Sequence, residues 1–418
     1  MSKRLLYLYY FFLLVVLCTW FNTTSAPPMP LRLIYLAALV FPVFLKAPNN
    51  LVPIINCFTA LGTYGFSRSY MPTEKWIYLL IIVICLFLGY SKLKRFQRPP
   101  SLMILFCVYI WSIDIIQGTK IVDIDYTILI VLLSFFFVSK DGSEKNSYIL
   151  AFMIITLILG LFFLTYGQSS AISVSETGRR SWVDPNYFGN VCGMGVVLAY
   201  NTIVNKLSQN LYFKRIAILT IALGLLTLVM NASRGAFLSA SVSIVIITFF
   251  SKVSIKTKVG IAVLVSIGVV AMFSMGAFDV LANRFMDQDD TTGNGRTLIW
   301  EAKLLGYIGL PTHEKLFGIG YDGGFSLAIP GGYGFHNDFL AFLVDYGLVG
   351  LLFFLALMLY PIIIVGKNSS ARPIVISLVL FLLTCCSTLE PLTAGKLPYW
   401  YYYFFIVLFA RWSKSRQR

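Results

Sequence analysis

Apolar stretches of about 15 to 27 residues follow one another along the whole chain, separated by short polar joints. A helix needs about 20 apolar residues to cross the hydrocarbon core of a bilayer, and it satisfies its own backbone groups there. No strand-like alternation of apolar and polar positions competes with this pattern. We therefore predict an all-α polytopic membrane protein with 12 to 14 transmembrane helices. The fourteen-span interpretation places them near residues 5–21, 31–45, 50–66, 76–90, 101–117, 124–138, 148–166, 185–204, 216–231, 235–251, 259–276, 339–365, 373–390 and 399–411.

The composition supports a membrane protein, since 58% of the 418 residues are hydrophobic and only 12% are charged. No internal repeat or low-complexity tract divides the chain, so we expect one integral membrane domain, 1–418. Residues 1–21 resemble a signal peptide, but an anchored first helix fits an even number of spans better. The seven cysteines lie in or at the ends of apolar spans without metal-ligand spacing, which gives disulfides little support.

The charges are segregated between the joints. If both termini are cytoplasmic, the inner joints hold 21 of the 33 Lys and Arg residues, and their only acidic residues are Asp141 and Glu144. Such an excess is the positive-inside pattern, and it orients the chain. Because the basic excess is spread over many short loops rather than gathered in one patch, nucleic-acid binding is not expected.

The outer face then carries one large loop, 277–338, and a medium one, 167–184. The large loop keeps many aromatic and aliphatic residues, so we expect it to fold over the membrane. Its Gly-Asn-Gly turn should be followed by a helix that starts at Arg296 and ends before Pro311. That helix would lie flat, with its aromatic residues at interfacial depth.

A glycine-rich segment, Gly318 to Gly334, completes the large loop with seven glycines in 17 residues. Glycines let backbone amides approach a ligand closely, or let a lid move. The alternative is a flexible loop without a direct role.

His336 stands where the large loop meets the apolar run 339–365, and it is one of only two histidines in the chain. It is the most conspicuous candidate for proton exchange near neutral pH. Asn337 and Asp338 are good caps for the following helix, so a capping or structural role is the alternative for this segment. Asp345 lies about 13 Å further along such a helix, where it could orient the base, pair with an arginine or bind a polar neighbour. The other histidine, His313, reads as a surface residue.

Arg234 lies in what should be a very tight outer turn between two apolar spans. An arginine at this depth is a functional candidate because it must face a cavity, a partner or the headgroups. Its guanidinium group suits phosphate oxygens, whereas the alternative is a snorkelling or headgroup-binding arginine. Arg296, next to the Gly-Asn-Gly turn, could face the same kind of anion, or could be a solvated loop residue.

Arg179 and Arg180 lie on the outer side, against the positive-inside trend, which indicates an anionic ligand. They precede Asp184 and Asn186 in the segment Arg-Arg-Ser-Trp-Val-Asp-Pro-Asn-Tyr-Phe-Gly. Asp184 could form an ion pair with an arginine that shapes the loop, and it could also cap a helix that has Pro185 at its first position.

Metal and nucleotide chemistry are not expected. Asp287, Asp289 and Asp290 could hold a divalent cation, but the segment equally fits an exposed loop, which we favour. Gly-Ile-Gly-Tyr-Asp-Gly resembles a dinucleotide fingerprint only as a string, because no strand precedes it. Arginines, one histidine and aromatic residues on the outer face instead suit a phosphate leaving group and the deprotonation of an attacking hydroxyl. A lipid-linked sugar pyrophosphate carries its own activation and fits this set without a cofactor.

Five motifs follow one another along the chain: Arg-Arg-Ser-Trp-Val-Asp-Pro-Asn-Tyr-Phe-Gly, Asn-Ala-Ser-Arg-Gly-Ala, Gly-Arg-Thr-Leu-Ile-Trp, then His-Asn-Asp-Phe-Leu and Asp-Tyr-Gly-Leu-Val-Gly. Their order resembles the O-antigen polymerase and O-antigen ligase superfamily of bacterial inner membranes. The resemblance implies a GT-C-like glycosyltransferase without metal. It maps functional residues of the ligase branch onto Arg234, Arg296 and His336, and more loosely onto Arg179 or Arg180.

This resemblance implies an inner-membrane enzyme with both termini cytoplasmic and the active site facing the periplasm. Asp-Pro-Asn-Tyr-Phe-Gly looks more like polymerases, which join undecaprenyl-pyrophosphate-linked repeat units, than like ligases, which use lipid A-core as acceptor. His336 would be the base, and direct attack would invert the anomeric carbon. Lipid-linked donor and acceptor glycans, membrane lipids and a chain-length regulator are the expected partners. A lipid-linked oligosaccharide flippase is a further alternative, although the broken midplane helices it requires are not evident.

Overall fold

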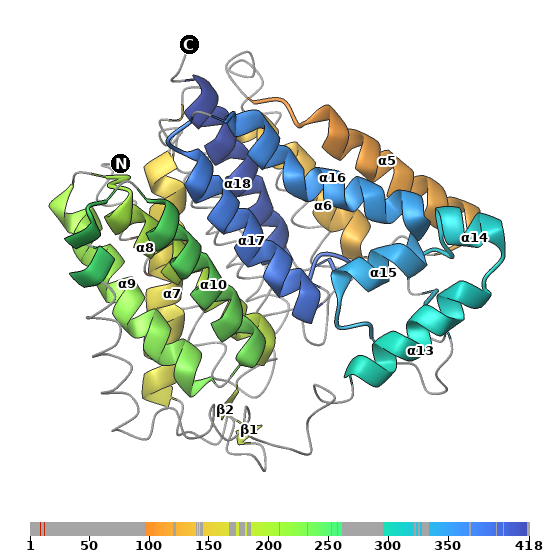
Figure 1. Ribbon diagram of the computed structural model, residues 1–418, viewed down its shortest axis with the longest axis horizontal. Coiled ribbons are helices and arrows are strands. Elements are labelled where there is room, and N and C mark those ends of the chain that lie inside the picture. Colours follow the sequence, from red (N-terminus) through yellow and green to blue (C-terminus); the bar gives the residue numbers. More distant parts are fainter. Residues whose placement is uncertain are drawn as a thin grey trace. The chain divides into compact units, whose positions relative to one another are not determined.

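The computed structural model describes residues 9, 12, 97–119, 123–138, 140, 142, 145–166, 173–174, 180–181, 185–208, 210–231, 233–251, 253–256, 258–260, 296–321, 323–324, 327, 334–367, 369–389, 391–395 and 397–415. This part of the chain consists almost entirely of α-helices (Figure 1). The exceptions are one 3₁₀ turn, η3 (Phe135–Phe137), and an antiparallel pair of two-residue strands, β1 (Ser173–Val174) and β2 (Arg180–Ser181). The predicted helical class is confirmed for these residues.

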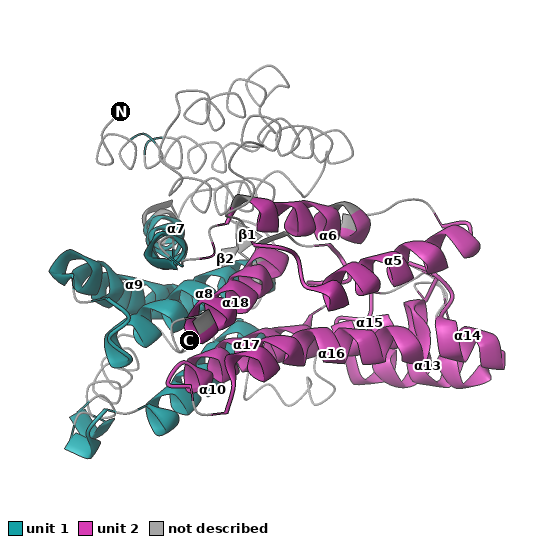
Figure 2. Ribbon diagram, turned by 90° about the horizontal axis from the view of Figure 1, so that it is seen from above, with its two compact units in different colours: residues 1–91, 141–285 teal, residues 92–140, 286–418 magenta. Residues whose placement is uncertain are grey.

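The chain divides into two compact units (Figure 2). Unit 1 comprises residues 1–91 and 141–285, and unit 2 comprises residues 92–140 and 286–418. The boundary between 285 and 286 falls inside the loop that the sequence assigns to 277–338. The single membrane domain over 1–418 stays a prediction.

Unit 1 is organised around one helix, α8 (Pro185–Val204), which packs against α7 (Lys145–Tyr166), α9 (Leu211–Met230) and α10 (Arg234–Phe250). Glycines permit this close packing. A Cβ at Gly195 would lie 1.9 Å from the Thr156 hydroxyl oxygen, and one at Gly224 would lie 2.4 Å from Val196 Cγ2. Small residues at helix contacts are how apolar helices approach closely in the absence of a hydrophobic driving force between them.

Unit 2 is built around α18 (Leu397–Ser415), whose residues 399 to 410 are buried against α6, α16 and α17. Aromatic contacts fill this core: Phe404 meets Phe135 edge-on at 4.6 Å, and Phe342 stacks on Phe354 at 4.4 Å. The remaining helices of unit 2 are α5 (Ser101–Ile116), α6 (Asp123–Ser134), α13 (Arg296–Gly309), α14 (Thr312–Phe317), α15 (Asp338–Asp345), α16 (Gly347–Val365) and α17 (Arg372–Thr388).

Helices occupy all the predicted spans between 101 and 251 and between 339 and 411. The predicted spans 5–21, 31–45, 50–66, 76–90 and 259–276 lie almost wholly outside the described residues. Among the described helices, α9 and α16 are both long and apolar enough to cross a bilayer, and five further helices contain apolar stretches of 10–17 residues. The total of about fourteen spans and the GT-C-like architecture stay predictions.

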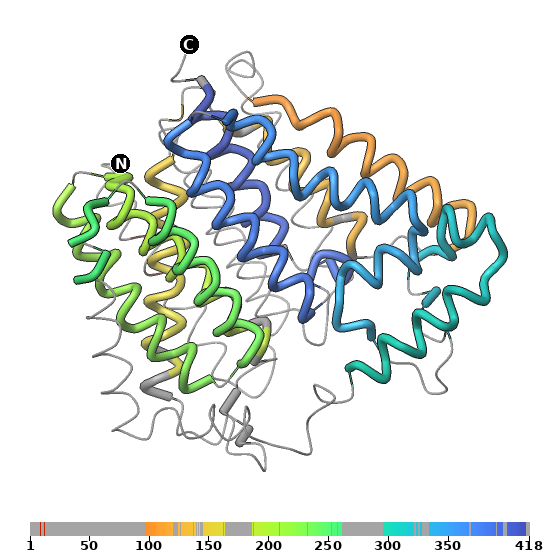
Figure 3. Tube along the Cα trace, in the orientation of Figure 1, coloured from red at the N-terminus to blue at the C-terminus, as the bar shows by residue number. Residues whose placement is uncertain are grey.

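One predicted span is corrected. The apolar run 339–365 forms two helices, and the chain changes direction sharply between α15 and α16 (Figure 3). Gly347 has a φ of +69°, a conformation that L side chains rarely adopt. A Cβ there would also lie 2.4 Å from the carbonyl of Leu316. The run breaks because α14 packs directly on this junction, which hydrophobicity alone does not reveal.

Candidate functional site

His336 is held from both sides. Its φ is +49°, and Lys206 is the only other non-glycine residue with a positive φ in the described part of the chain. On one side, the Phe335 carbonyl accepts a hydrogen bond of 2.7 Å from the indole N–H of Trp300. On the other, the Asn337 side chain caps α15 and accepts the Leu340 N–H at 3.2 Å. The capping role predicted for Asn337 is confirmed, and the half-buried His336 lies at a fixed, strained position.

Asp338 is a fully buried carboxylate that joins α15 to the turn after α17. It accepts hydrogen bonds from the Leu392 N–H at 3.1 Å, the Thr393 N–H at 2.9 Å and the Thr393 hydroxyl at 2.7 Å. Its own N–H donates to the Leu389 carbonyl at 3.0 Å. Burial raises the pKa of Asp338 to about 6, and these hydrogen bonds oppose the increase. The sequence had assigned this residue only to capping.

Helix α13 turns its polar and aromatic residues towards the His336 segment. Arg296, Trp300, Lys303 and Tyr307 follow one another at helical spacing and share one face. The buried Lys303 ammonium donates to the Gly324 carbonyl and lies 5.3 Å from the Phe335 ring centroid. The half-buried Arg296 precedes Trp300 by one turn, about 6 Å along the axis. Arg296 therefore lies on the same face of α13 as Trp300, which donates a hydrogen bond to the carbonyl of Phe335, the residue before His336.

Asp345 holds the glycine-rich segment. Its carboxylate accepts the Gly324 N–H at 3.1 Å, and its carbonyl accepts the Gly320 N–H at 2.8 Å. Gly324 has no room for a side chain, because a Cβ would lie 2.3 Å from Phe335 Cζ. Of the roles considered for Asp345, these contacts support the binding of a polar neighbour. The glycines permit close packing on α15 at this point.

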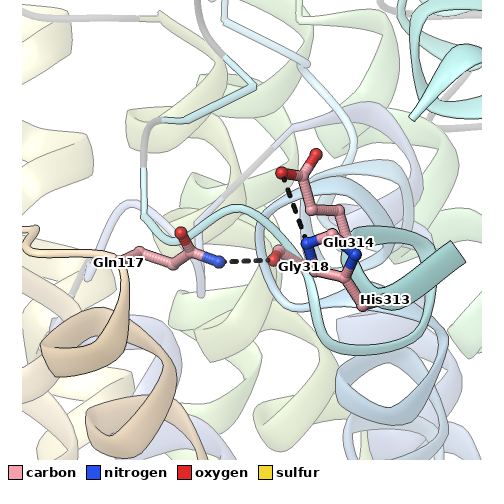
Figure 4. A network of polar contacts seen from close by, with 4 residues as sticks. All are labelled: Gln117, His313, Glu314 and Gly318. Carbon is pink, nitrogen blue, oxygen red and sulfur yellow. Dashed lines mark hydrogen bonds and ion pairs between the residues drawn. The ribbon is translucent and has the colours of Figure 1, made fainter. Parts of the chain in front are cut away.

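The end of α5 supports the same segment. Asp114 accepts the Tyr321 N–H at 2.9 Å and the Tyr346 hydroxyl at 3.3 Å. Gln117 donates to the Gly318 carbonyl at 3.1 Å (Figure 4). Asp114 was not singled out in the sequence, although a carboxylate inside the predicted span 101–117 is a signal that could have found it.

Figure 4 also shows His313 beside Glu314 on α14, with 3.8 Å between the imidazole nitrogen and the carboxylate oxygen. The His313 side chain is 73% exposed. Its prediction as a surface residue is confirmed.

Arg234 begins α10, directly after the tight turn that the sequence predicts between α9 and α10. Ser233 caps this helix, with its hydroxyl oxygen 3.5 Å from the Ala236 N–H. The same hydroxyl donates to the Asn186 side chain on α8 at 2.9 Å. A Cβ at Gly189 would lie 2.8 Å from the Ala236 Cβ, so α8 touches the start of α10. Asn186 thus fixes the turn from which the half-buried Arg234 projects.

The other predicted site residues are less completely described. Arg180 lies in β2, where it pairs with Val174. Arg179, Asp184 and the acidic residues 287, 289 and 290 lie outside the described residues. Arg234 and Asn186 belong to unit 1, whereas Arg296, His336, Asn337 and Asp345 belong to unit 2.

Two long apolar helices and a predominantly helical fold in the described part of the chain suggest an integral membrane protein. Residues 219–355, about a third of the chain, match the family model described as O-antigen ligase, and this segment includes Arg234, Arg296 and His336. The match relates this part of the chain to O-antigen ligases and polymerases, and it does not distinguish between the two activities. A search of curated proteins finds no match.

Proposed function

We propose that the protein is a polymerase of O-antigen or a related surface polysaccharide. It joins undecaprenyl-pyrophosphate-linked repeat units at the periplasmic face of the bacterial inner membrane, as a metal-independent inverting glycosyltransferase. The family match supports this general class of reaction. The segment Asp-Pro-Asn-Tyr-Phe-Gly, residues 184–189, favours polymerase within the class.

In this proposal a hydroxyl oxygen of the acceptor repeat unit attacks the anomeric carbon of the lipid-linked donor. The new C–O glycosidic bond forms as the bond to the pyrophosphate breaks, and undecaprenyl pyrophosphate leaves with the bonding electrons. His336 takes the proton of the attacking hydroxyl. Arg296 and Arg234 hold pyrophosphate oxygens and stabilise the charge that develops there. Arg179 or Arg180 is assigned to the same anion, and Asp184 to the loop that carries them.

The observation that carries the proposal is the backbone of His336. A non-glycine residue with a φ of +49° costs stability, and strain of this kind clusters at active sites. Here the Trp300 hydrogen bond and the Asn337 cap impose it from either side. Packing alone would not require a titratable residue at such a position.

The test uses the two histidines as a matched pair. His336→Asn keeps a residue that tolerates positive φ but cannot act as a base. With synthetic lipid-linked repeat units and the purified protein in nanodiscs, we expect chain elongation to fall at least 100-fold, in line with the usual contribution of a general base. His313→Asn should elongate chains at the wild-type rate. Full elongation by His336→Asn would remove the base assignment.

The ligase is the second candidate, because the matching family model carries that description. The two reactions share the donor and differ in the acceptor. Supplying lipid A-core as the only acceptor separates them. Glycan transfer to lipid A-core, with no product from repeat units alone, would replace polymerase by ligase. Translocation of the lipid-linked glycan without a new glycosidic bond would overturn both.

A further inference from the structure

Helix α13 faces outwards with aliphatic side chains. Its inward face uses Trp300, Lys303 and Tyr307, each of which donates a hydrogen bond to a backbone carbonyl. Leu304, Leu305 and Ile308 on the other side are exposed. The sequence had placed Trp300 and Tyr307 at the membrane interface, but these two residues point into the loop. The second half of the helix therefore presents aliphatic side chains to its surroundings.

The apolar surface continues onto α14. Leu316 and Phe317 are exposed there, and the five side chains Leu304, Leu305, Ile308, Leu316 and Phe317, between 39% and 61% exposed, form what we call the outer apolar patch. The Phe317 carbonyl lies 3.3 Å from the Tyr109 hydroxyl of α5. The Leu316 backbone contacts Gly347. The outer apolar patch thus begins where α5 ends and α16 starts.

The neighbouring surface of α16 is the one that a membrane-crossing helix presents to lipid. Leu348 and Leu352, in its first turns, are exposed, and so are Ile115 and Ile116 at the end of α5. Exposed side chains on a helix that crosses the bilayer contact acyl chains. Figure 1 shows α13 running across the direction of α16, as a helix lying along a membrane surface would. The outer apolar patch adjoins this surface of α16 where the Leu316 backbone meets Gly347.

Polarity changes along the exposed side of α13. In its first half Leu298 is exposed together with the polar residues Thr297 and Glu301, whereas the exposed side chains of its second half, the half next to α14, are the aliphatic Leu304, Leu305 and Ile308. A helix that enters the headgroup region with only its second half would show this distribution. A partner that covered the whole helix would meet Glu301 in the middle of its interface.

We propose that the outer apolar patch is inserted into the outer leaflet of the bilayer, and that it anchors α13 and α14 to the membrane surface. The occupant is lipid rather than a soluble partner, because the patch adjoins the start of α16, a helix that is long and apolar enough to cross a bilayer. This anchor fixes the height of α13 above the bilayer, and with it the height of Arg296 and Trp300. The inference does not depend on which reaction the protein catalyses.

Site-directed spin labels on the full-length protein in nanodiscs test the insertion. Ile308 and Thr297 lie on the same side of α13, 11 residues and about 16 Å apart. A label on Ile308→Cys should collide preferentially with oxygen, which dissolves in lipid, and one on Thr297→Cys with a water-soluble nickel chelate. Leu305→Cys and Glu301→Cys, which lie one turn apart, form a second pair of labelling positions. They repeat the comparison if a label at Ile308 or Thr297 disturbs the helix.

Two results of the collision measurements would overturn the proposed insertion. Equal access of the nickel chelate to the labels on Ile308→Cys and Thr297→Cys would place the patch in water and overturn the proposal. Protection of Ile308→Cys from both reagents would mean that protein covers the patch, which would overturn it too. The thermal unfolding of each labelled variant should match that of the wild type, since all four positions are exposed.

Discussion

Asp338 illustrates how much a single residue depends on its surroundings. In the sequence it is one acidic residue after His336 and Asn337, suited to the start of a helix. In the structure it is a buried carboxylate whose three hydrogen bonds join α15 to the turn that follows α17. These hydrogen bonds also help to fix the backbone of His336, which lies two residues before Asp338. We therefore regard Asp338 as a positioning residue.

The raised pKa of Asp338 makes its contribution to stability depend on pH. Because the folded protein holds this proton more tightly than the unfolded chain, the unfolding free energy falls as pH rises from about 4 towards 7. With an unfolded value of 3.8 and a folded value of about 6, the whole effect is about 3 kcal/mol, of which about 1 kcal/mol falls between pH 5 and pH 7. Asp338→Asn removes this titration.

We expect the stability of wild type minus that of Asp338→Asn to fall by about 1 kcal/mol between pH 5 and pH 7, measured by chemical or thermal unfolding in detergent. Glu301→Gln, an exposed acid on α13, is the control with the same charge change. A difference for Asp338→Asn that is flat, or that grows with pH, would contradict the assigned pKa.

At the scale of elements, the junction between α15 and α16 determines how the loop meets the membrane. Gly347 lets the backbone of Leu316 pass against it, and Tyr109 of α5 donates to the Tyr346 carbonyl at 2.7 Å. Three segments far apart in the sequence therefore meet at one helix break. A longer unbroken helix would have carried Asp345 away from the glycine-rich segment that it holds.

Gly347 and Gly366, at the two ends of α16, allow the effect of backbone strain to be separated from the effect of steric crowding. Gly347 and Gly366 both have positive φ, but only Gly347 lacks space, since nothing lies within 4 Å of a Cβ at Gly366. Gly366, with φ +78° and ψ +155°, lies in a backbone region essentially restricted to glycine, so Gly366→Ala should cost about 1 to 3 kcal/mol from backbone strain. Gly347→Ala should cost a further 1 to 3 kcal/mol from overpacking. Equal losses of thermal stability would show that α14 does not constrain the break.

Helix α13 shows what a local pattern can and cannot predict. Its end before Pro311 follows from the apolar spacing and the proline, and it is observed. The face it turns inwards was not predictable, because Trp300 and Tyr307 serve an interface and a hydrogen-bonded contact equally well. The carbonyls of Phe335 and Lys315, supplied by the folded loop, decide between the two.

At the scale of the whole molecule, the segregation of charge should govern orientation. The inner joints carry most of the basic residues, which predicts cytoplasmic termini and a periplasmic large loop. Lys140 and Thr312 are exposed and lie in joints assigned to opposite sides. Each can carry a cysteine for labelling by a membrane-impermeant maleimide, because the four cysteines that the structure describes are buried.

We expect Thr312→Cys to react in intact spheroplasts and Lys140→Cys to react only after the membrane is permeabilised. The fraction of protein that reacts with the maleimide, measured by a gel shift, shows on which side of the membrane each cysteine lies. The wild type, which keeps its seven native cysteines, sets the background. Labelling of Lys140→Cys in sealed spheroplasts would reverse the orientation, and with it the compartment proposed for His336.

The sequence alone determined the class of this protein, because apolar length, charge segregation and turn residues act locally and are readable one segment at a time. It also pointed to Arg234, Arg296 and His336. A cation next to apolar spans is costly unless it has a partner, and His336 is one of only two histidines in the chain. Only the tertiary structure decided the break at Gly347, the inward face of α13 and the roles of Asp114 and Asp338. Those depend on which distant backbone groups meet each side chain, and that pairing is a property of the packed chain.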